Sequence, residues 1–481
     1  MGHQHTEARE AAWTGLDQVT PGYHWLSIEP GQHRFLQAVF SGLGFRALRV
    51  WTEAAVSAAD FERTRCGGLV TAVGEFRGRT VAIAWSDFRV VAACYGRANS
   101  RRFAAFLRHL RNAGEDPTPL IYFVNSAGLS LMEGRQLFSD AFALWPELLE
   151  YAAQNPFFTC ALGKCLGLAP ILFGLGHYRV AVGGKTQLNL AGPEVIRLFF
   201  GEGADFAGNA AAERFHDRND FIHELVPSVE AAFARFRELL GAEPATAAGG
   251  CPGLPARTRA LLDAFLDAPP RELVPGWSDR VRLFLGTRKG TPLGLFVNPP
   301  ERSNNMITVR TLDKYGAGLD LFGAMRLPIV SFLDSPGIDP RFDQSDANNF
   351  RKMLRVGEKI IRYPHGSMGV VTQRCFGGSA TLAFPKVFGG TRAVAIRGSR
   401  IGTMHESIIT RQLQGSPRLL AQWKAIEAGQ GPELEDLLAE GSLDAVIELA
   451  DLPAEIDRFL AAPRRAVGNR SPSLALQRAA V

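Results

Sequence analysis

One short segment of the chain ends an apolar run in a pattern that can turn backbone N–H groups toward a ligand. Residues 332–340 read FLDSPGIDP, so that the run stops at Asp334 and a glycine follows at position 337. A D-x-x-G of this kind also occurs in nucleotide switches, but that use needs a phosphate loop of the form G-x-x-x-x-G-K-S/T. The nearest candidate, RVAVGGKTQ, has Arg179 in place of the first glycine. The sequence therefore favours a corner that holds something against main-chain amides over a nucleotide site.

The same corner occurs twice. TPLIYFVNSAGLS (118–130) and LPIVSFLDSPGID (327–339) align without a gap and place Gly128 opposite Gly337. Downstream, FFTCALGKCLGLAPIL (157–172) matches MGVVTQRCFGGSATLAF (368–384), with Gly167 opposite Gly377. Two further pairs of segments, starting at 177 and 390 and at 219 and 441, follow in the same order. Four matches at a nearly constant offset predict a tandem duplication.

The elements that must position these corners alternate along each copy. Short apolar runs such as LIYFV and YRVAV are bounded by turn residues, and segments with helical periodicity lie between them, which indicates an α/β fold. A glycine at the end of such a strand lets a ligand approach the main chain closely. Any one of these glycines alone would be read as a turn residue. Their recurrence in both copies favours paired anion-binding corners, at Gly128, Gly167, Gly337, Gly377 and Gly378.

Composition excludes several other classes of protein. The 481 residues are 46% apolar and 21% charged, with a formal net charge of +5, which is too small and too spread out for a nucleic-acid footprint. No apolar run of about 18 residues and no signal peptide is present, so a cytoplasmic protein is expected. The dense basic segment 96–112 is interpreted as an amphipathic helix with a solvated basic face. A contact for ligand phosphates is the less favoured interpretation of the same segment. The scattered cysteines are expected to be buried thiols without a metal: Cys66, Cys94, Cys160, Cys165, Cys251 and Cys375.

The duplicated motifs resemble the carboxyltransferase (β) subunits of biotin-dependent acyl-CoA carboxylases and their decarboxylase and transcarboxylase relatives. The resemblance rests on segments such as NSAGLSLMEG (125–134), GKCLGLA (163–169) and RCFGGSATL (374–382). It implies two tandem crotonase-like domains of the β-β-α superhelix type, also called the ClpP/crotonase fold. The expected organisation is an N-terminal extension (1–60), a first domain (61–243), a linker (244–272), a second domain (273–465) and a tail (466–481).

The resemblance also implies which residues form the site. In the family, one pair of main-chain N–H groups holds the thioester oxygen and a second pair holds the carbonyl of biotin. Carried over by position, the first pair is Gly167 and Leu168 and the second is Gly378 and Ser379. Such sites stabilise oxyanions with amides, so the absence of an obvious histidine or carboxylate base is expected. The residues implied to shape the substrate site are Ala127, Gly128, Ser130, Gly337, Ile338, Gly377 and Thr381.

The implied function is the carboxyltransferase component of a biotin-dependent acyl-CoA or acyl-thioester carboxylase. The chain contains no biotin-attachment motif, so biotin would be carried on a separate protein, and a biotin carboxylase and biotin carrier subunit are expected partners. An oligomer, such as a trimer of dimers, is also expected; a metal, nucleic acid and a membrane are not. Two alternatives stay open: a malonyl-type thioester decarboxylase or other enolate-forming enzyme, and a non-catalytic scaffold subunit paired with an active homologue.

The chain departs from the family pattern mainly in its first half. Ala127 and Ser130 replace a glycine and an arginine, and Leu168 stands where the family has glycine. Thr381 occupies a position that many relatives fill with an aspartate linked to the choice of acyl chain. These replacements predict an altered acyl pocket and leave open both the acyl group and whether it is carried on CoA or on a carrier protein.

Overall fold

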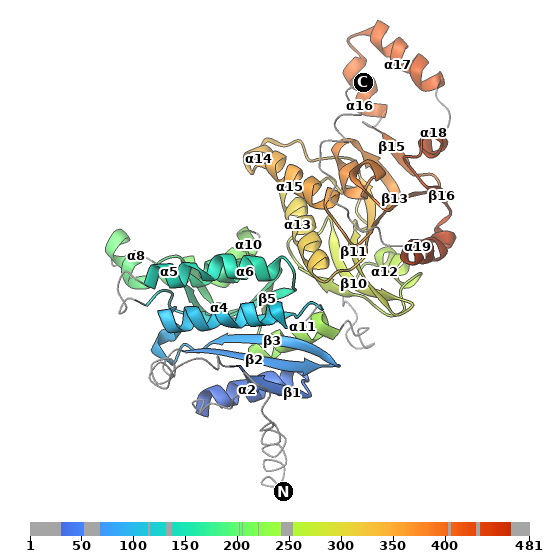
Figure 1. Cartoon of the computed structure of the whole chain (residues 1–481). Coiled ribbons are helices and arrows are strands. Elements are labelled where there is room, and N and C mark those ends of the chain that lie inside the picture. The colour runs from blue at the N-terminus through green and yellow to red at the C-terminus, as the bar shows by residue number, and fades with distance from the viewer. Residues whose placement is uncertain are drawn as a thin grey trace. The chain divides into compact units, whose positions relative to one another are not determined.

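The computed structural model consists of two compact units, residues 1–241 and 242–481 (Figure 1). The structure describes residues 30–51, 68–113, 116–130, 137–201, 203, 205–219, 221–241, 254–402, 406–429 and 433–462. Cys66, Cys251, residues 244–253 of the expected linker and the whole expected tail lie outside the described residues. The rest of the expected linker is described and includes α12 (Ala256–Asp263). Each unit is an α/β domain built around one sheet.

The sheet of the first unit has eight strands in the order β1-β2-β3-β4-β5-β6-β8, with β7 paired to β5. The first three strands are antiparallel and the others are parallel. Arg77 and Gly78 connect β2 to β3 with positive φ angles of 52° and 78°, as a tight hairpin turn requires. The strands are β1 (Ala47–Val50), β2 (Leu69–Phe76), β3 (Arg79–Ser86), β4 (Leu120–Ser126), β5 (Phe157–Leu166), β6 (Tyr178–Val182), β7 (Gln187–Asn189) and β8 (Glu224–Val226).

The second sheet repeats this path strand for strand. Its order is β9-β10-β11-β12-β13-β14-β16, with β15 paired to β13. The hairpin turn recurs at Lys289 and Gly290, which have φ angles of 49° and 75°. The predicted tandem duplication is therefore confirmed. The strands are β9 (Arg271–Leu273), β10 (Arg282–Arg288), β11 (Thr291–Val297), β12 (Ile329–Ser335), β13 (Ser367–Phe376), β14 (Arg392–Ile396), β15 (Arg400–Gly402) and β16 (Ala445–Ile447).

Helices connect the strands in the same order in both units. Those of the first unit are α2 (Pro30–Leu43), α4 (Arg97–Asn112), α5 (Leu137–Phe142), α6 (Leu144–Ala152), α7 (Ala169–Gly174), α8 (Pro193–Phe200), α9 (Phe206–Ala210), α10 (Ala212–Arg218) and α11 (Val229–Gly241), with a 3₁₀ turn η1 (Val91–Ala93). Those of the second are α12 (Ala256–Asp263), α13 (Val309–Ala324), α14 (Phe342–Asp346), α15 (Asn349–Ile361), α16 (Glu406–Leu413), α17 (Pro417–Gly429), α18 (Glu433–Ala439) and α19 (Leu452–Ala461), with 3₁₀ turns η4 (Gly377–Ala383), η5 (Lys386–Phe388) and η6 (Leu449–Asp451).

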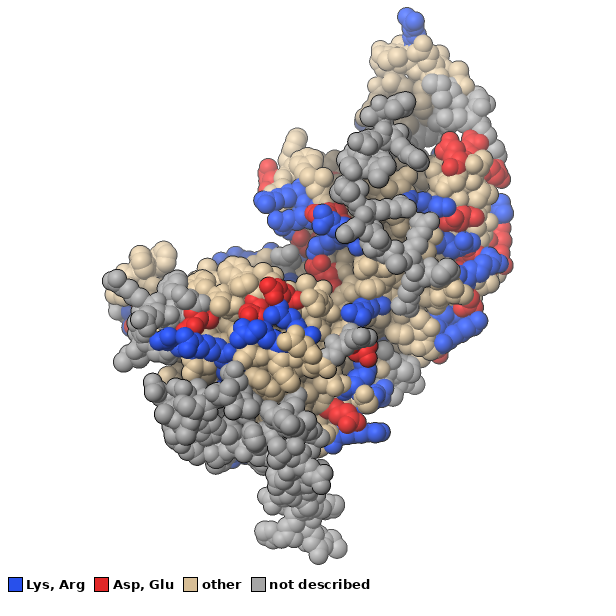
Figure 2. Space-filling model, viewed as in Figure 1, with Lys and Arg blue, Asp and Glu red and all other residues tan. Residues whose placement is uncertain are grey.

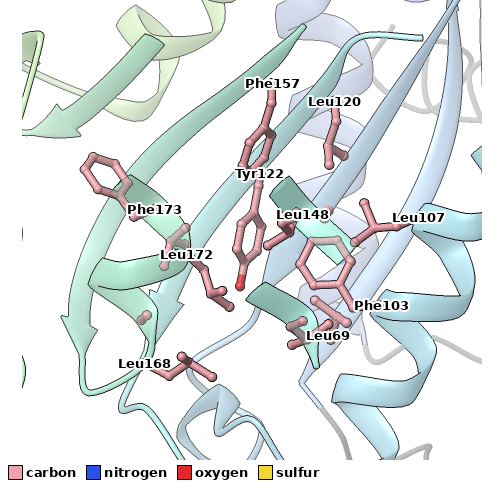
Figure 3. Close-up of a cluster of buried hydrophobic side chains, with 14 of the residues drawn as sticks. Leu69, Phe103, Leu107, Leu120, Tyr122, Leu148, Phe157, Leu168, Leu172 and Phe173 are labelled. Carbon is pink, nitrogen blue, oxygen red and sulfur yellow. The ribbon is translucent and has the colours of Figure 1, made fainter. Parts of the chain in front are cut away.

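Helix α4 shows why its sequence forms a core helix. Phe103, Phe106, Leu107 and Leu110 recur at helical spacing, and all four are buried. They pack on one face of the sheet in a cluster that includes side chains from β4, β5, α6 and α7 (Figure 3).

The basic face of α4 is paired rather than only solvated. Arg97 and Arg101 both donate to Asp140 of α5, at 2.9 and 3.0 Å. Farther along the helix, Arg108 and Arg111 reach Glu147 of α6, at 2.6 and 2.8 Å. Figure 2 shows the blue and red side chains next to one another over these helices. The interpretation as an amphipathic helix is confirmed, and this arginine row holds α4 to its neighbours.

The other face of the first sheet is covered by α11 and α2. Phe35 of α2 stacks on Trp85 with ring centroids 4.0 Å apart, and Phe233 and Phe236 of α11 pack against Phe123. Because β1 also joins the sheet, the described residues 30–51 are an integral part of the first unit. No helix among the described residues is long and apolar enough to span a membrane.

Candidate active site

The first candidate corner lies where β4 and β5 end, at residues 126–130 and 166–169. The Ser126 hydroxyl accepts a hydrogen bond from the Gly128 N–H at 3.1 Å and donates to the Ala93 carbonyl at 2.7 Å. Gly128 has a φ of 103° and Gly167 a φ of 61°, and a Cβ built on Gly128 would lie 2.9 Å from the Leu166 carbonyl oxygen. Only glycine permits both these backbone angles and this close approach of the two loops.

The second corner is built in the same way, at residues 335–338 and 376–379. The Ser335 hydroxyl lies 3.2 Å from the Gly337 N–H, which donates to it. Gly337 and Gly377 have φ angles of 130° and 55°. Gly378 packs so close to Ile338 that an added Cβ would lie 3.0 Å from its Cγ1 atom. The predicted recurrence of the corner is thus present in three dimensions.

A backbone bridge supports each corner from the side. The Tyr95 N–H donates to the Gly128 carbonyl at 2.7 Å and the Ser130 N–H donates to the Tyr95 carbonyl at 3.3 Å. In the second unit, the Ile307 N–H donates to the Gly337 carbonyl at 2.9 Å, and the Asp339 N–H returns to the Ile307 carbonyl at 2.9 Å. Neither bridge was predicted, because residues so far apart in the chain carry no shared sequence signal.

The N–H groups at the first corner differ in their availability. The Gly167 N–H already donates to the Asn189 carbonyl of β7 at 3.0 Å. By contrast, the N–H groups of Leu168 and Ala169, at the start of α7, find no acceptor among the described residues. Unpaired amides at the start of a helical turn are natural anion donors. The structure therefore supports Leu168 and Ala169 more strongly than Gly167 as donors in this corner.

The second corner also begins a helical turn, η4. The N–H of Gly378, its second residue, finds no acceptor among the residues that the structure describes. Ser379, its third residue, is the first whose N–H can bond back within a 3₁₀ turn, toward the Phe376 carbonyl. The structure therefore supports Gly378 more strongly than Ser379 as the donor here.

Leu168 presents its main chain, and not its side chain, to the corner. Its φ and ψ of −70° and −26° are accessible to any residue, and its side chain is 3% exposed within the core cluster (Figure 3). The Leu168 side chain therefore packs in the core and adds no bulk to the corner. A residue with a side chain is accepted at this position because the chain there is right-handed.

The remaining predicted residues lie around the two corners. Ala127 donates its N–H to the Ala92 carbonyl at 3.0 Å, and Ser130 is half-buried beside it. Ala92 belongs to the turn Val91–Ala93, whose φ angles of 49°, 50° and 46° are unusual for residues with side chains. Sequence reasoning missed this turn because valine and alanine give no sign of left-handed backbone. Thr381 is half-buried in η4, and its methyl carbon faces Gly357 of α15.

Several titratable groups are buried behind the corners. The Tyr95 hydroxyl lies 2.5 Å from that of Tyr122, which lies 2.7 Å from the Ser86 hydroxyl, and burial raises the pKa of both tyrosines. Burial also lowers the pKa of Lys314 to about 8; its ammonium donates to the Ser278 carbonyl at 3.0 Å. The tyrosines stay neutral at physiological pH, so they can position the backbone but cannot act as bases.

No side chain in this set is arranged as a metal site or a general base. No group of three or more metal-ligating residues occurs in the described part of the chain. His223 is buried and its ring nitrogen accepts a hydrogen bond from the main-chain N–H of Arg179 at 3.2 Å, which is a structural contact. Cys160, Cys165 and Cys375 are buried free thiols whose pKa burial raises. The groups that this arrangement offers to a ligand are therefore main-chain N–H donors.

Comparison with solved structures identifies the fold. The transcarboxylase 12S subunit, solved as a hexamer with methylmalonyl-coenzyme A and methylmalonic acid bound, superposes with a TM-score of 0.69 at 20% identity. The match covers 84% of this chain and 84% of that one. The fold is therefore the tandem-duplicated crotonase-like fold of carboxyltransferase subunits, as expected.

Comparison of sequences gives a similarity to the same kind of subunit. Residues 39–275 match the model of the carboxyl transferase domain. The carboxyltransferase subunit of propionyl-CoA carboxylase from Haloferax mediterranei is 23% identical over 350 residues, which is 67% of this chain and 66% of that protein. The beta6 subunit of a biotin-dependent acetyl-/propionyl-coenzyme A carboxylase from Mycobacterium bovis is 24% identical over 447 residues, 84% of this chain and 91% of that protein. Residues 39–275 therefore match a carboxyl transferase domain, and the chain is similar to carboxyltransferase subunits over 84% of its length.

Proposed function

We propose that the chain is the carboxyltransferase component of a biotin-dependent acyl-thioester carboxylase. The observation that carries the proposal is the pair of corners with the same construction, each of which leads into a helical turn whose first N–H groups find no acceptor among the described residues. Transfer of a carboxyl group between biotin and an acyl thioester passes through two oxyanions, and each requires preorganised donors. Two corners supply two sets of donors.

The first corner would hold the thioester oxygen of the substrate. The Leu168 and Ala169 N–H groups lie at the start of α7, where the partial positive charge of the helix end also favours an anion. The side chains of Leu168 and Ala169 are buried, so the core fixes the backbone that carries these donors. As charge develops on the thioester oxygen, fixed donors stabilise it without reorganising.

The second corner fits the carbonyl group of biotin. Gly378 lacks a Cβ where one would meet Ile338 at 3.0 Å, and both Gly377 and Gly378 are exposed. Ser379 is buried and its hydroxyl donates to the Phe376 carbonyl at 2.8 Å, which fixes the start of η4. The Gly378 N–H would bind the carbonyl oxygen, with the Ser379 N–H beside it.

The chain's task toward biotin would be limited to binding and orientation. When bound, biotin would supply the carboxyl group and the basic nitrogen that accepts the α-proton. The chain needs only to orient it and to stabilise charge on its carbonyl oxygen.

The active form would be an oligomer, because each unit exposes apolar side chains that a second copy would cover. The α5–α6 surface exposes Trp145 and Leu149. The α14–α15 surface exposes four apolar residues: Phe342, Phe350, Leu354 and Ile361. In the proposed assembly, the apolar surface on the first unit of one copy packs against the apolar surface on the second unit of another.

Partners follow from the same proposal. Biotin would arrive on a carrier protein that is charged by a biotin carboxylase, and the acyl group would arrive on CoA or on a carrier protein. The relative from transcarboxylase assembles as a hexamer. We expect this chain to form an assembly of the same type.

The proposal is tested by incubating the pure protein with malonyl-, methylmalonyl- and longer carboxyacyl-thioesters, with and without biotin. We expect loss of the carboxyl group from the thioester to depend on biotin and carboxybiotin to form. Decarboxylation at the same rate without biotin would instead show that the protein is a malonyl-type thioester decarboxylase, which is one of the two alternatives to the proposed function. No reaction with any thioester, together with co-purification of an active homologue, would identify the scaffold alternative.

A further inference from the structure

The two corners share a β-bulge that sets their position. Between Val124 and Ser126, β4 advances by two residues while β5 advances by four, from Ala161 to Cys165. The second sheet repeats this shift between β12 and β13, so that one residue, Asp334, lies opposite residues 372–374. A bulge redirects the chain that follows it, and here the glycines of each corner follow within three residues. Whatever holds the bulge therefore holds the corner.

The residue opposite the bulge holds it differently in the two units. In the first unit, the Asn125 side-chain oxygen accepts the Lys164 N–H at 2.8 Å, and the Lys164 ammonium turns to Gln187 of β7. In the second unit, the carboxylate of Asp334, 1% exposed, accepts two hydrogen bonds from the Arg374 guanidinium, at 2.7 and 2.9 Å. A bidentate ion pair is stronger and more directional than a single neutral hydrogen bond.

Arg374 also reaches the other side of the second corner. Its remaining terminal nitrogen donates to the Ser303 carbonyl at 3.0 Å. Ser303 lies in the loop after β11, and four residues later Ile307 donates its N–H to the Gly337 carbonyl. One guanidinium thus connects the end of β12, the bulge of β13 and the loop that supports Gly337. Three segments that are distant in sequence converge on it.

The second corner needs such an anchor more than the first. Leu168 and Ala169 of the first corner are both fixed by buried side chains, whereas in the second corner only Ser379 has a buried side chain, and Gly377 and Gly378 are exposed. Donors to a developing oxyanion must stay within about 0.5 Å of their productive positions. The nearest side chain on the N-terminal side that makes a fixed polar contact outside the corner is Arg374.

We infer that Asp334 and Arg374 form a positioning pair that aligns the start of η4, with the Gly378 and Ser379 N–H groups, for the biotin carbonyl. The pair contacts no reacting atom and acts through the backbone of the bulge. The inference rests on the proposed function for the identity of the ligand, but the alignment of the corner is a property of the chain itself. It also answers what the D-S-P-G segment does: its aspartate is an anchor for an arginine 40 residues away.

The test compares Arg374→Gln with Arg288→Gln. Arg288 makes a bidentate pair of the same kind with Asp457, at 2.7 and 2.8 Å, within the second unit, but it joins β10 to α19 and not to the corner. Hydrogen exchange of peptides that cover residues 374–384 is measured for both variants and for Asp334→Asn. Biotin-dependent decarboxylation of the preferred carboxyacyl-thioester is measured alongside, with kcat and KM determined separately for biotin and thioester.

We expect Arg374→Gln and Asp334→Asn to raise exchange at the corner and to lower kcat by about 10- to 100-fold, with the KM for the thioester changed less than about twofold. Arg374→Lys keeps the charge but not the bidentate contact, so its corner exchange and its kcat should lie between those of the parent protein and those of Arg374→Gln. Arg288→Gln should leave corner exchange and kcat near the parent values even if it lowers the Tm. Equal effects of Arg374→Gln and Arg288→Gln on corner exchange would overturn the inference. If the parent protein shows no biotin-dependent reaction, the proposed function fails, and the exchange comparison still decides the role of the pair.

Discussion

Gly378 is a position at which one added side chain should lower the reaction rate strongly and the stability of the fold only slightly. In Gly378→Val the new Cβ would lie 3.0 Å from the Cγ1 atom of Ile338, and the two γ-methyl groups add further bulk. This separation is tighter than an ordinary van der Waals contact, so the loop or Ile338 must move by a few tenths of an ångström. The peptide N–H groups of Gly378 and Ser379 move with the loop.

The expected loss can be estimated from the donors involved. Loss of one oxyanion donor typically costs about 10²–10³ in rate, which corresponds to about 2.7–4 kcal/mol of transition-state stabilisation. Stability should change much less, since Gly378 is exposed and its φ does not lie in the left-handed region. Gly378→Ala, which adds only the Cβ, should give an intermediate rate.

The assay follows biotin-dependent loss of the carboxyl group, with the KM for the thioester and thermal unfolding as parallel measurements. Gly415→Val is the matched control, because Gly415 lies in the same unit, would meet no atom within 4 Å of an added Cβ and does not require a positive φ. Parent-like kcat in a folded Gly378→Val protein would remove the second corner from the mechanism. An equal loss in Gly415→Val would show that the effect is not local.

Three further predictions concern the core, a buried charge and the assembly. Leu168→Ala should lower the free energy of unfolding by about 2–5 kcal/mol in a denaturant titration, because it empties a buried site; a loss under about 0.5 kcal/mol would contradict the packing role. Because burial lowers the pKa of Lys314 to about 8, the unfolded state binds more protons between about pH 8 and 10.5. The free energy of unfolding of the parent protein, minus that of Lys314→Met, should therefore rise by about 2 kcal/mol from about pH 7.5 to 9.5. A difference that does not change with pH would refute this. Leu354→Glu, on the exposed α15 surface, should shift the protein toward smaller species in light scattering and lower transfer activity, and an active, unchanged oligomer would exclude that surface.

Much of the candidate site could be predicted from local sequence. The repeated N-S-A-G and D-S-P-G segments indicate strand ends followed by glycine, and the structure has β4 and β12 end at Ser126 and Ser335. Positive φ at Gly128 and Gly337 follows from the same signal, since glycine tolerates this conformation without cost. These features depend on only a few neighbouring residues, which is why a single sequence suffices to find them.

Other features of the corners have no local signal. The Gly167 N–H is taken by the Asn189 carbonyl, and the left-handed turn at 91–93 has no glycine. Both depend on how strands and loops far apart in the chain meet. The position of residues 30–51 in the first unit is likewise set by pairing of β1 with β2, not by any motif.

The sequence by itself determined the duplication, the alternation of strands and helices and the glycine corners, because each is a pattern of spacing or repetition along the chain. Only the tertiary structure decided which amides of the first corner remain free, that the Leu168 side chain belongs to the core, and that Asp334 is bound by Arg374. These outcomes depend on strand register and on the packing of segments about 20 to 40 residues apart, where a shift of one residue exchanges buried and exposed side chains. Spacing specifies where a corner can form, and long-range packing specifies which of its atoms are left to bind a ligand.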